Sequence, residues 1–112
     1  MSERRNRSRE ACDLAEVLDG RYTPWWREVE VLETPRRIRI VADDPSGPDD
    51  DTTSEREVKP REVVETFDRI AKTRPSLLCC LADMTEEHLG MGCAEDADVI
   101  FQTLIYGRIV FG

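Results

Sequence analysis

Residues 25–42, WWREVEVLETPRRIRIVA, decide the fold of this 112-residue chain. On both sides of a turn at residues 33–36, apolar and charged residues alternate with a period of two. This pattern is typical of a β-hairpin with one buried and one charged face. Glutamates occupy the charged face of the first strand and arginines that of the second. We expect ion pairs between them, at roughly 0.2–1 kcal/mol each, to fix the register.

Apolar residues recur at helical spacing on both sides of the hairpin. They predict one helix before it and three after it, over about residues 8–19, 60–74, 76–89 and 93–106. Residues 109–111 are too apolar for a free tail, so we expect them to add a third strand or to pack under the sheet. The chain is therefore predicted to be α+β, with an N-terminal helix, a β-hairpin and a three-helix C-terminal unit packed on the sheet.

Most of the acidity lies in one segment. The chain has a formal net charge of −8, and residues 43–58 alone hold seven acidic side chains and one basic one. Such a charged stretch with proline, glycine and serine buries too little apolar surface to offset the entropy of ordering it. We expect a single domain, 1–112, with these parts: a basic arm (1–9), the helix plus hairpin (10–42), an acidic flexible connector (43–58) and a helical unit with a short terminal strand (59–112).

Composition limits the class of protein. There is no apolar run near 18 residues and no apolar leader at the start, so we expect neither a membrane span nor a signal peptide. The expected location is the cytoplasm, or the virion if the chain is virally encoded. Arginine outnumbers lysine 14 to 2, which fits a GC-rich genome or a halophilic source. Phosphate-binding loops, zinc-protease motifs and nucleophile elbows are missing, so no enzyme is predicted.

Cys79, Cys80, His88 and Cys93 are weak candidates for a metal site. Their spacing lacks the C-x2-C knuckle that lets two thiolates share one ion. In an unbroken helix over 76–89, Cys80 and His88 would also stand about 12 Å apart along the axis, with Cys79 facing elsewhere. Only a break in that helix would let the side chains meet. We therefore interpret the cysteines as small buried residues and predict no cofactor.

Partner-binding candidates come from three places in the sequence. Two consecutive strand residues face opposite ways, so one tryptophan of the pair at 25–26 should enter the core and the other should be available to anchor a protein partner. The arm and the connector carry opposite charges. The candidates are Trp25, Trp26, Arg4, Arg5, Arg7, Asp49, Asp50 and Asp51.

These observations favour a small non-enzymatic interaction protein, an accessory or structural subunit of a larger assembly, of viral or mobile-element origin. Its partner would be another protein or a second copy of the chain, and not a membrane. Two alternatives remain open: an acidic inhibitor that mimics nucleic acid, and a zinc-dependent regulator. Nucleic-acid binding is disfavoured by the net charge and by the acidic residues that open the last helix.

Overall fold

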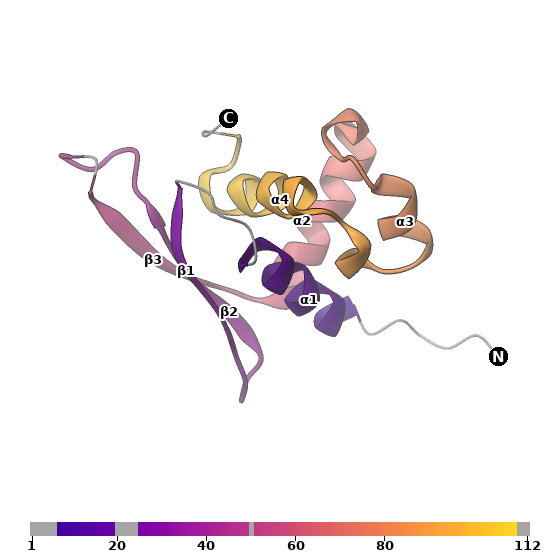
Figure 1. Cartoon of the computed structure of the whole chain (residues 1–112), viewed down its shortest axis with the longest axis horizontal. Coiled ribbons are helices and arrows are strands. Elements are labelled where there is room, and N and C mark those ends of the chain that lie inside the picture. The colour runs from indigo at the N-terminus through magenta and orange to yellow at the C-terminus, as the bar shows by residue number, and fades with distance from the viewer. Residues whose placement is uncertain (1–6, 20–24, 50, 110–112) are drawn as a thin grey trace.

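The computed structural model describes residues 7–19, 25–49 and 51–109, and within them it has an N-terminal helix, a three-stranded antiparallel sheet and then helices (Figure 1). This confirms the predicted α+β class. The sheet, in the order β1-β2-β3, lies at one side of the molecule and the helices at the other. The elements are α1 (Arg7–Asp19), β1 (Trp26–Leu32), β2 (Arg37–Asp43), β3 (Thr53–Val58), α2 (Pro60–Thr73), the 3-10 turn η1 (Pro75–Leu77), α3 (Leu81–Glu86), the 3-10 turn η2 (Leu89–Met91) and α4 (Ala94–Tyr106).

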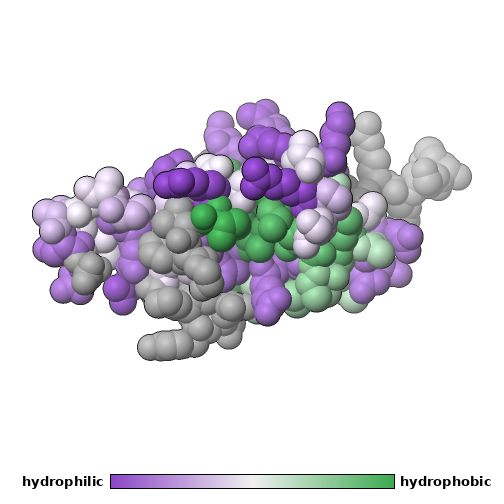
Figure 2. All heavy atoms as spheres, turned by 90° about the horizontal axis from the view of Figure 1, so that it is seen from above, coloured by the Kyte–Doolittle hydropathy of each residue, from purple (hydrophilic) through white to green (hydrophobic). Residues whose placement is uncertain are grey.

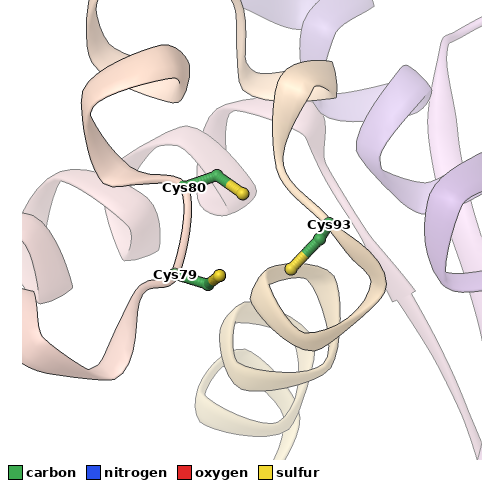
Figure 3. A group of neighbouring side chains, drawn as sticks. All are labelled: Cys79, Cys80 and Cys93. Atoms are coloured by element: carbon green, nitrogen blue, oxygen red, sulfur yellow. The ribbon is translucent and has the colours of Figure 1, made fainter.

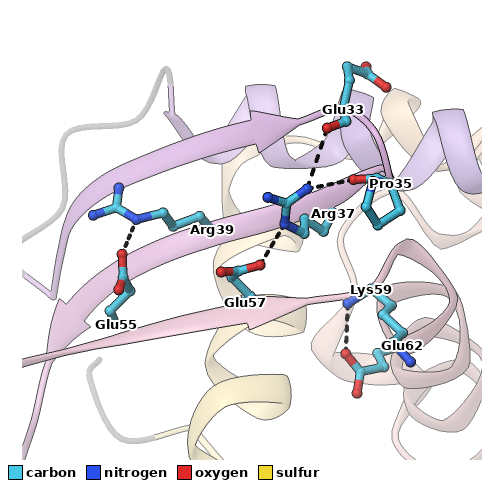
Figure 4. A network of polar contacts seen from close by, with 8 residues as sticks. All are labelled: Glu33, Pro35, Arg37, Arg39, Glu55, Glu57, Lys59 and Glu62. Atoms are coloured by element: carbon cyan, nitrogen blue, oxygen red, sulfur yellow. Dashed lines mark hydrogen bonds and ion pairs between the residues drawn. The ribbon is translucent and has the colours of Figure 1, made fainter.

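The central strand β2 shows the predicted alternation. Ile38, Ile40 and Ala42 are fully buried against the helices. Arg37 and Arg39, which alternate with Ile38 and Ile40, point to the opposite face (Figure 4). The predicted hairpin is confirmed, with β1 and β2 paired antiparallel.

The charged face extends further than the hairpin. Arg39 pairs with Glu28 of β1 at 3.5 Å, as the alternation predicted, and also with Glu55 of β3. Arg37 donates to Glu57 of β3, with 2.6 Å between Nε and Oε1. Arg39 therefore lies between glutamates of both neighbouring strands, whereas Arg37 pairs with β3 and donates to the backbone carbonyls of Glu33 and Pro35 in the turn (Figure 4).

The third strand lies in a different place from the one expected. β3 is formed by Thr53–Val58, inside the segment interpreted as a flexible connector, and it pairs with β2 along its length. The glutamates that suggested disorder face the β2 arginines, so their charge favours pairing. Ile109 belongs to no strand, and the rest of the expected C-terminal strand lies outside the described residues.

Three of the four predicted helices are confirmed. α1, α2 and α4 match their periodic patterns, and Gly107 ends α4 with a left-handed φ of 79° that favours glycine. The single helix predicted over 76–89 is wrong, because the structure has η1, α3 and η2 there. The reason is long-range: the backbone N–H groups of Cys79 and Cys80 donate to the Asp96 carboxylate of α4.

Trp25 connects the sheet to α4. Its side chain is 1% exposed, and its indole Nε1 donates to Asp98 Oδ1 at 2.8 Å. The ring of Tyr106 meets it edge-on, with 6.1 Å between ring centroids. The Tyr106 hydroxyl then donates to the carbonyl oxygen of Asp43 at 2.5 Å.

No helix in the described part of the chain is long and apolar enough to cross a membrane.

We expect Trp25→Phe to destabilise the fold by about 2–3 kcal/mol, because it removes a buried hydrogen bond and part of a core ring. Trp26→Phe is the matched control. Trp26 is partly buried, and its Nε1 has no hydrogen-bond partner among the described residues. Urea denaturation followed by circular dichroism measures both variants. Equal losses would contradict the role given to Trp25.

Tyr106 makes stability depend on alkaline pH. Burial, together with the charges of Asp43 and Asp44, raises the pKa of Tyr106 to about 12 from its ordinary value of 10.0. The folded state therefore favours the neutral phenol, so its contribution is complete below pH 10 and is lost as pH rises from 10 to 12. Ultraviolet titration of phenolate should show one of the two tyrosines ionising late, and Tyr106→Phe should abolish that late step.

Candidate functional site

A basic pocket of about 550 Å³ opens where α1, the β1–β2 turn and the start of α2 meet. Five of its nine lining residues are cationic and none is acidic, in a chain whose net charge is −8. Two prolines and a valine add apolar surface. The lining residues are Arg7, Ser8, Pro35, Arg36, Arg37, Lys59, Pro60, Arg61 and Val64.

Four of the five cations of the basic pocket have an ion-pair partner, including Arg36 with Glu33 at 3.2 Å and Arg37 with Glu57 at 2.6 Å. Arg7 pairs with Asp68 at 3.1 Å, yet its buried Nε has no hydrogen-bond partner in the described part of the chain. Lys59 has no ion pair among the described residues (Figure 4). Exposed ion pairs such as that of Arg61 with Glu65, at 3.6 Å, contribute roughly 0–1 kcal/mol, so an anionic ligand can compete for them.

An acidic turn, described at residues 44–49 and 51–52, lies at the opposite end of the sheet. It follows β2 and precedes β3, whereas the basic pocket lies before β2 and after β3. About 17 Å of β3 separates the two. Hydrogen bonds order the turn: Asp44 accepts from the side chain and the backbone of Ser46, which lowers the pKa of Asp44. Asp49 accepts from the N–H of Asp51 at 3.0 Å.

The predicted partner-binding residues are divided among these features. Arg7 lies in the basic pocket, and Asp49 and Asp51 are exposed in the acidic turn. Trp25 is the core tryptophan and Trp26 is only partly buried. Arg4, Arg5 and Asp50 lie outside the described residues.

Most of the basic pocket was missed at the sequence level. Its other cations come from two short segments, PRR at 35–37 and KPR at 59–61, which lie 22 residues apart. Both place cations beside a proline that starts or precedes an element. The similarity of these two proline-and-cation segments was the only sequence signal for the basic pocket. The pairing of β2 with β3 is what brings the two segments together.

A second candidate site is the cysteine cluster, formed by Cys79, Cys80 and Cys93. The three Sγ atoms all lie within 4.8 Å of one another. Figure 3 shows their side chains pointing toward a common space, two from the segment before α3 and one from the residue before α4. The geometric objection to this site held only for an unbroken helix over 76–89, and the structure breaks that helix into η1, α3 and η2.

Asp96 fixes the backbone around the cysteine cluster. This carboxylate is fully buried and accepts hydrogen bonds from the N–H groups of Cys79 at 2.6 Å, Cys80 at 3.1 Å and Cys93 at 3.0 Å. The thiol of Cys93 also donates to it at 3.4 Å. One side chain thereby holds all three cysteines at the start of α4.

His88, the fourth predicted ligand, lies elsewhere. Its Nδ1 accepts from the N–H of Gly90 at 2.8 Å, and its Nε2 lies 3.4 Å from Asp13 Oδ2 of α1. His88 therefore joins η2 to α1, and the structure brings together only the three cysteines of the predicted set.

The thiols of the cysteine cluster are poor nucleophiles. Burial, the hydrogen bond to Asp96 and its negative charge raise the pKa of Cys80 to about 12. The pKa of Cys79 is also raised: a hydrogen bond with Cys80 lowers it, but interactions with Cys93 and Asp96 outweigh this. Protonated thiols at neutral pH do not attack carbonyls or disulfides readily, which argues against cysteine catalysis.

Apolar side chains gather on the helical half of the surface. Seen from above, a green band lies over the helices while the sheet end is hydrophilic (Figure 2). Leu77 and Ile109, 37% and 39% exposed, line a hollow of about 190 Å³ beside the end of α4.

Comparison of this chain with protein-family models, with curated proteins and with solved structures finds no match in any of the three.

We expect Asp96→Asn to destabilise the fold by about 2–4 kcal/mol, because charge-assisted bonds to three backbone N–H groups are weakened in a buried place. Glu95→Gln is the control, since Glu95 lies exposed in the same first turn of α4. Thermal unfolding at neutral pH compares the two. A loss for Asp96→Asn no larger than that of the control would contradict this role for Asp96.

Proposed function

We propose that this chain is a small non-enzymatic interaction protein, a structural or accessory subunit that associates head to tail with further copies of itself. The acidic turn of one copy enters the basic pocket of the next. The observation that carries the proposal is the basic pocket, where five cations gather on a strongly acidic protein.

Charge complementarity favours a second copy as the occupant. The acidic turn has aspartates at 44, 49 and 51 among its described residues and no basic residue. Its prolines at 45 and 48 limit the backbone freedom lost on binding. The apolar part of the basic pocket, Pro35, Pro60 and Val64, suits such a proline-containing loop.

The sheet prevents the turn from reaching its own pocket. The two features lie at opposite ends of β2 and β3, and these paired strands are rigidly extended between them. Any contact between them must therefore join two molecules. Such a contact uses different surfaces on the two copies, so repetition produces a ring or an open filament.

The nucleic-acid-mimicking alternative receives less support. A mimic needs an array of uncompensated carboxylates, but Glu55 and Glu57 on the sheet face pair with arginines of β2. The carboxylate of Asp43 likewise pairs with Arg27 at 3.0 Å. Acidic groups without an ion pair among the described residues lie on different elements, in the acidic turn and on helices, as at Glu86 of α3 and Glu95 of α4.

Two charge reversals test head-to-tail association. Lys59→Glu damages only the basic pocket, and Asp51→Lys damages only the acidic turn. We expect wild-type protein to form oligomers that grow with concentration and dissociate as salt shortens the screening length from about 10 Å at 0.1 M to about 3 Å at 1 M. Each variant alone should be largely monomeric in sedimentation velocity.

An equimolar mixture of the two variants gives the decisive result. The intact turn of Lys59→Glu can enter the intact pocket of Asp51→Lys, so the mixture should form heterodimers and nothing larger. Lys72→Glu and Glu86→Lys, at exposed positions late in α2 and α3, are matched controls that should behave as wild type. A wild-type protein that stays monomeric at low salt, or a mixture without heterodimers, would overturn the proposal.

A further inference from the structure

We propose that Cys79, Cys80 and Cys93 bind one thiophilic metal ion of the Zn²⁺ type, with all three thiolates as ligands. This site is separate from the basic pocket and does not depend on self-association. The proposal stands on the convergence of three thiols from two segments, 13 residues apart, at the start of one helix (Figure 3).

The cysteine cluster needs only a small contraction to enclose an ion. Its Sγ atoms lie within 4.8 Å of one another. A tetrahedral zinc ion with bonds of about 2.3 Å to sulfur places its thiolates about 3.8 Å apart. A change of rotamer at Cys79, which is exposed, supplies movement of this size without moving a helix.

The backbone around the cysteine cluster is already ordered. Asp96 accepts from the N–H groups of all three cysteines, so the ligand loop does not have to form when the ion binds. Because both carboxylate oxygens hold these amides, we assign Asp96 as a positioning residue. Metal ligands in proteins commonly depend on such outer partners.

The donor atoms select the class of metal. Three sulfur ligands favour zinc and other thiophilic ions over magnesium or calcium, which take oxygen ligands. On binding, three S–H bonds break, three metal–sulfur bonds form and three protons pass to the buffer. No electron is transferred. The exposure of Cys79 leaves the fourth position of the ion accessible to water.

Cobalt serves as the spectroscopic probe for the test. The full chain is reduced and stripped with a chelator under anaerobic conditions, then titrated with Co²⁺ and afterwards with Zn²⁺. We expect one ion per chain, a thiolate-to-cobalt charge-transfer band, tetrahedral d–d bands, and loss of both when Zn²⁺ displaces Co²⁺. Magnesium and calcium should not displace it.

Alanine variants of all four cysteines locate the site. We expect metal binding to weaken by more than about 100-fold in each of Cys79→Ala, Cys80→Ala and Cys93→Ala. This exceeds the loss of about 10–100-fold that is typical when a residue that only supports a ligand is replaced. Cys12→Ala is the matched control and should bind as wild type, because Cys12 is buried in α1 and lies outside the cysteine cluster. Asp96→Asn should weaken binding by about 10–100-fold with unchanged cobalt bands.

A second measurement needs no variant. In unmodified reduced protein, Zn²⁺ should protect Cys79, Cys80 and Cys93 from alkylation, mapped by mass spectrometry, and leave the reactivity of Cys12 unchanged. Equal reactivity with and without Zn²⁺, a cobalt complex without the thiolate band, or equal loss of binding in Cys12→Ala would overturn the proposal.

Discussion

Two arginines on the central strand set the conditions for most of this structure. Arg37 and Arg39 stand on the exposed face of β2 with glutamates of β1 or β3 beside them. Individually such surface pairs contribute little to stability. These ion pairs matter because they fix the register of β3 on β2. Without the arginines, the negative charges in the segment that contains β3 would repel one another. Once β3 is paired with β2 and Val58 is buried, the acidic turn and the start of α2 are carried to opposite ends of the sheet.

A single carboxylate has a similar effect in the helical half. Asp96 is buried at the first turn of α4, where its charge also complements the positive end of the helix dipole. By accepting the N–H groups of Cys79 and Cys80, it takes up hydrogen bonds that a continuous helix would have used. The helix is thereby replaced by shorter turns, and the two cysteines are turned toward Cys93. In both halves, charged side chains select the local backbone structure of a distant part of the sequence.

The sequence predicted what depends on local periodicity. α1, the hairpin, α2 and α4 were found because apolar residues repeat at the spacing of their own element. β3 was missed because composition suggests disorder, and only its partners on β2 reverse that interpretation. The break before α3 was missed because its cause lies 16 and 17 residues away in Asp96.

The candidate sites follow the same division. The cysteines were recognised as the right residue types, but their convergence was rejected on helical geometry that holds only for an uninterrupted helix. Of the basic pocket, Arg7 alone was anticipated, since a pocket made by a β-turn, a helix start and a neighbouring helix has no contiguous pattern. The sequence shows which residues could bind a metal or an anion. Which of them lie close together depends on the strand order and on long-range hydrogen bonds, and these do not follow from local sequence patterns.

The formal charge of −8 therefore describes this molecule poorly. Within residues 43–58, Glu55 and Glu57 are compensated by β2, and Asp43 is compensated by Arg27. The acidic turn at one end of the sheet has no such partners among the described residues, and the basic pocket gathers cations at the other end. The paired strands of the sheet hold these two charge concentrations apart, so they cannot contact each other within one molecule. This separation of charge is the basis of the proposed head-to-tail association, which the net charge alone would not suggest.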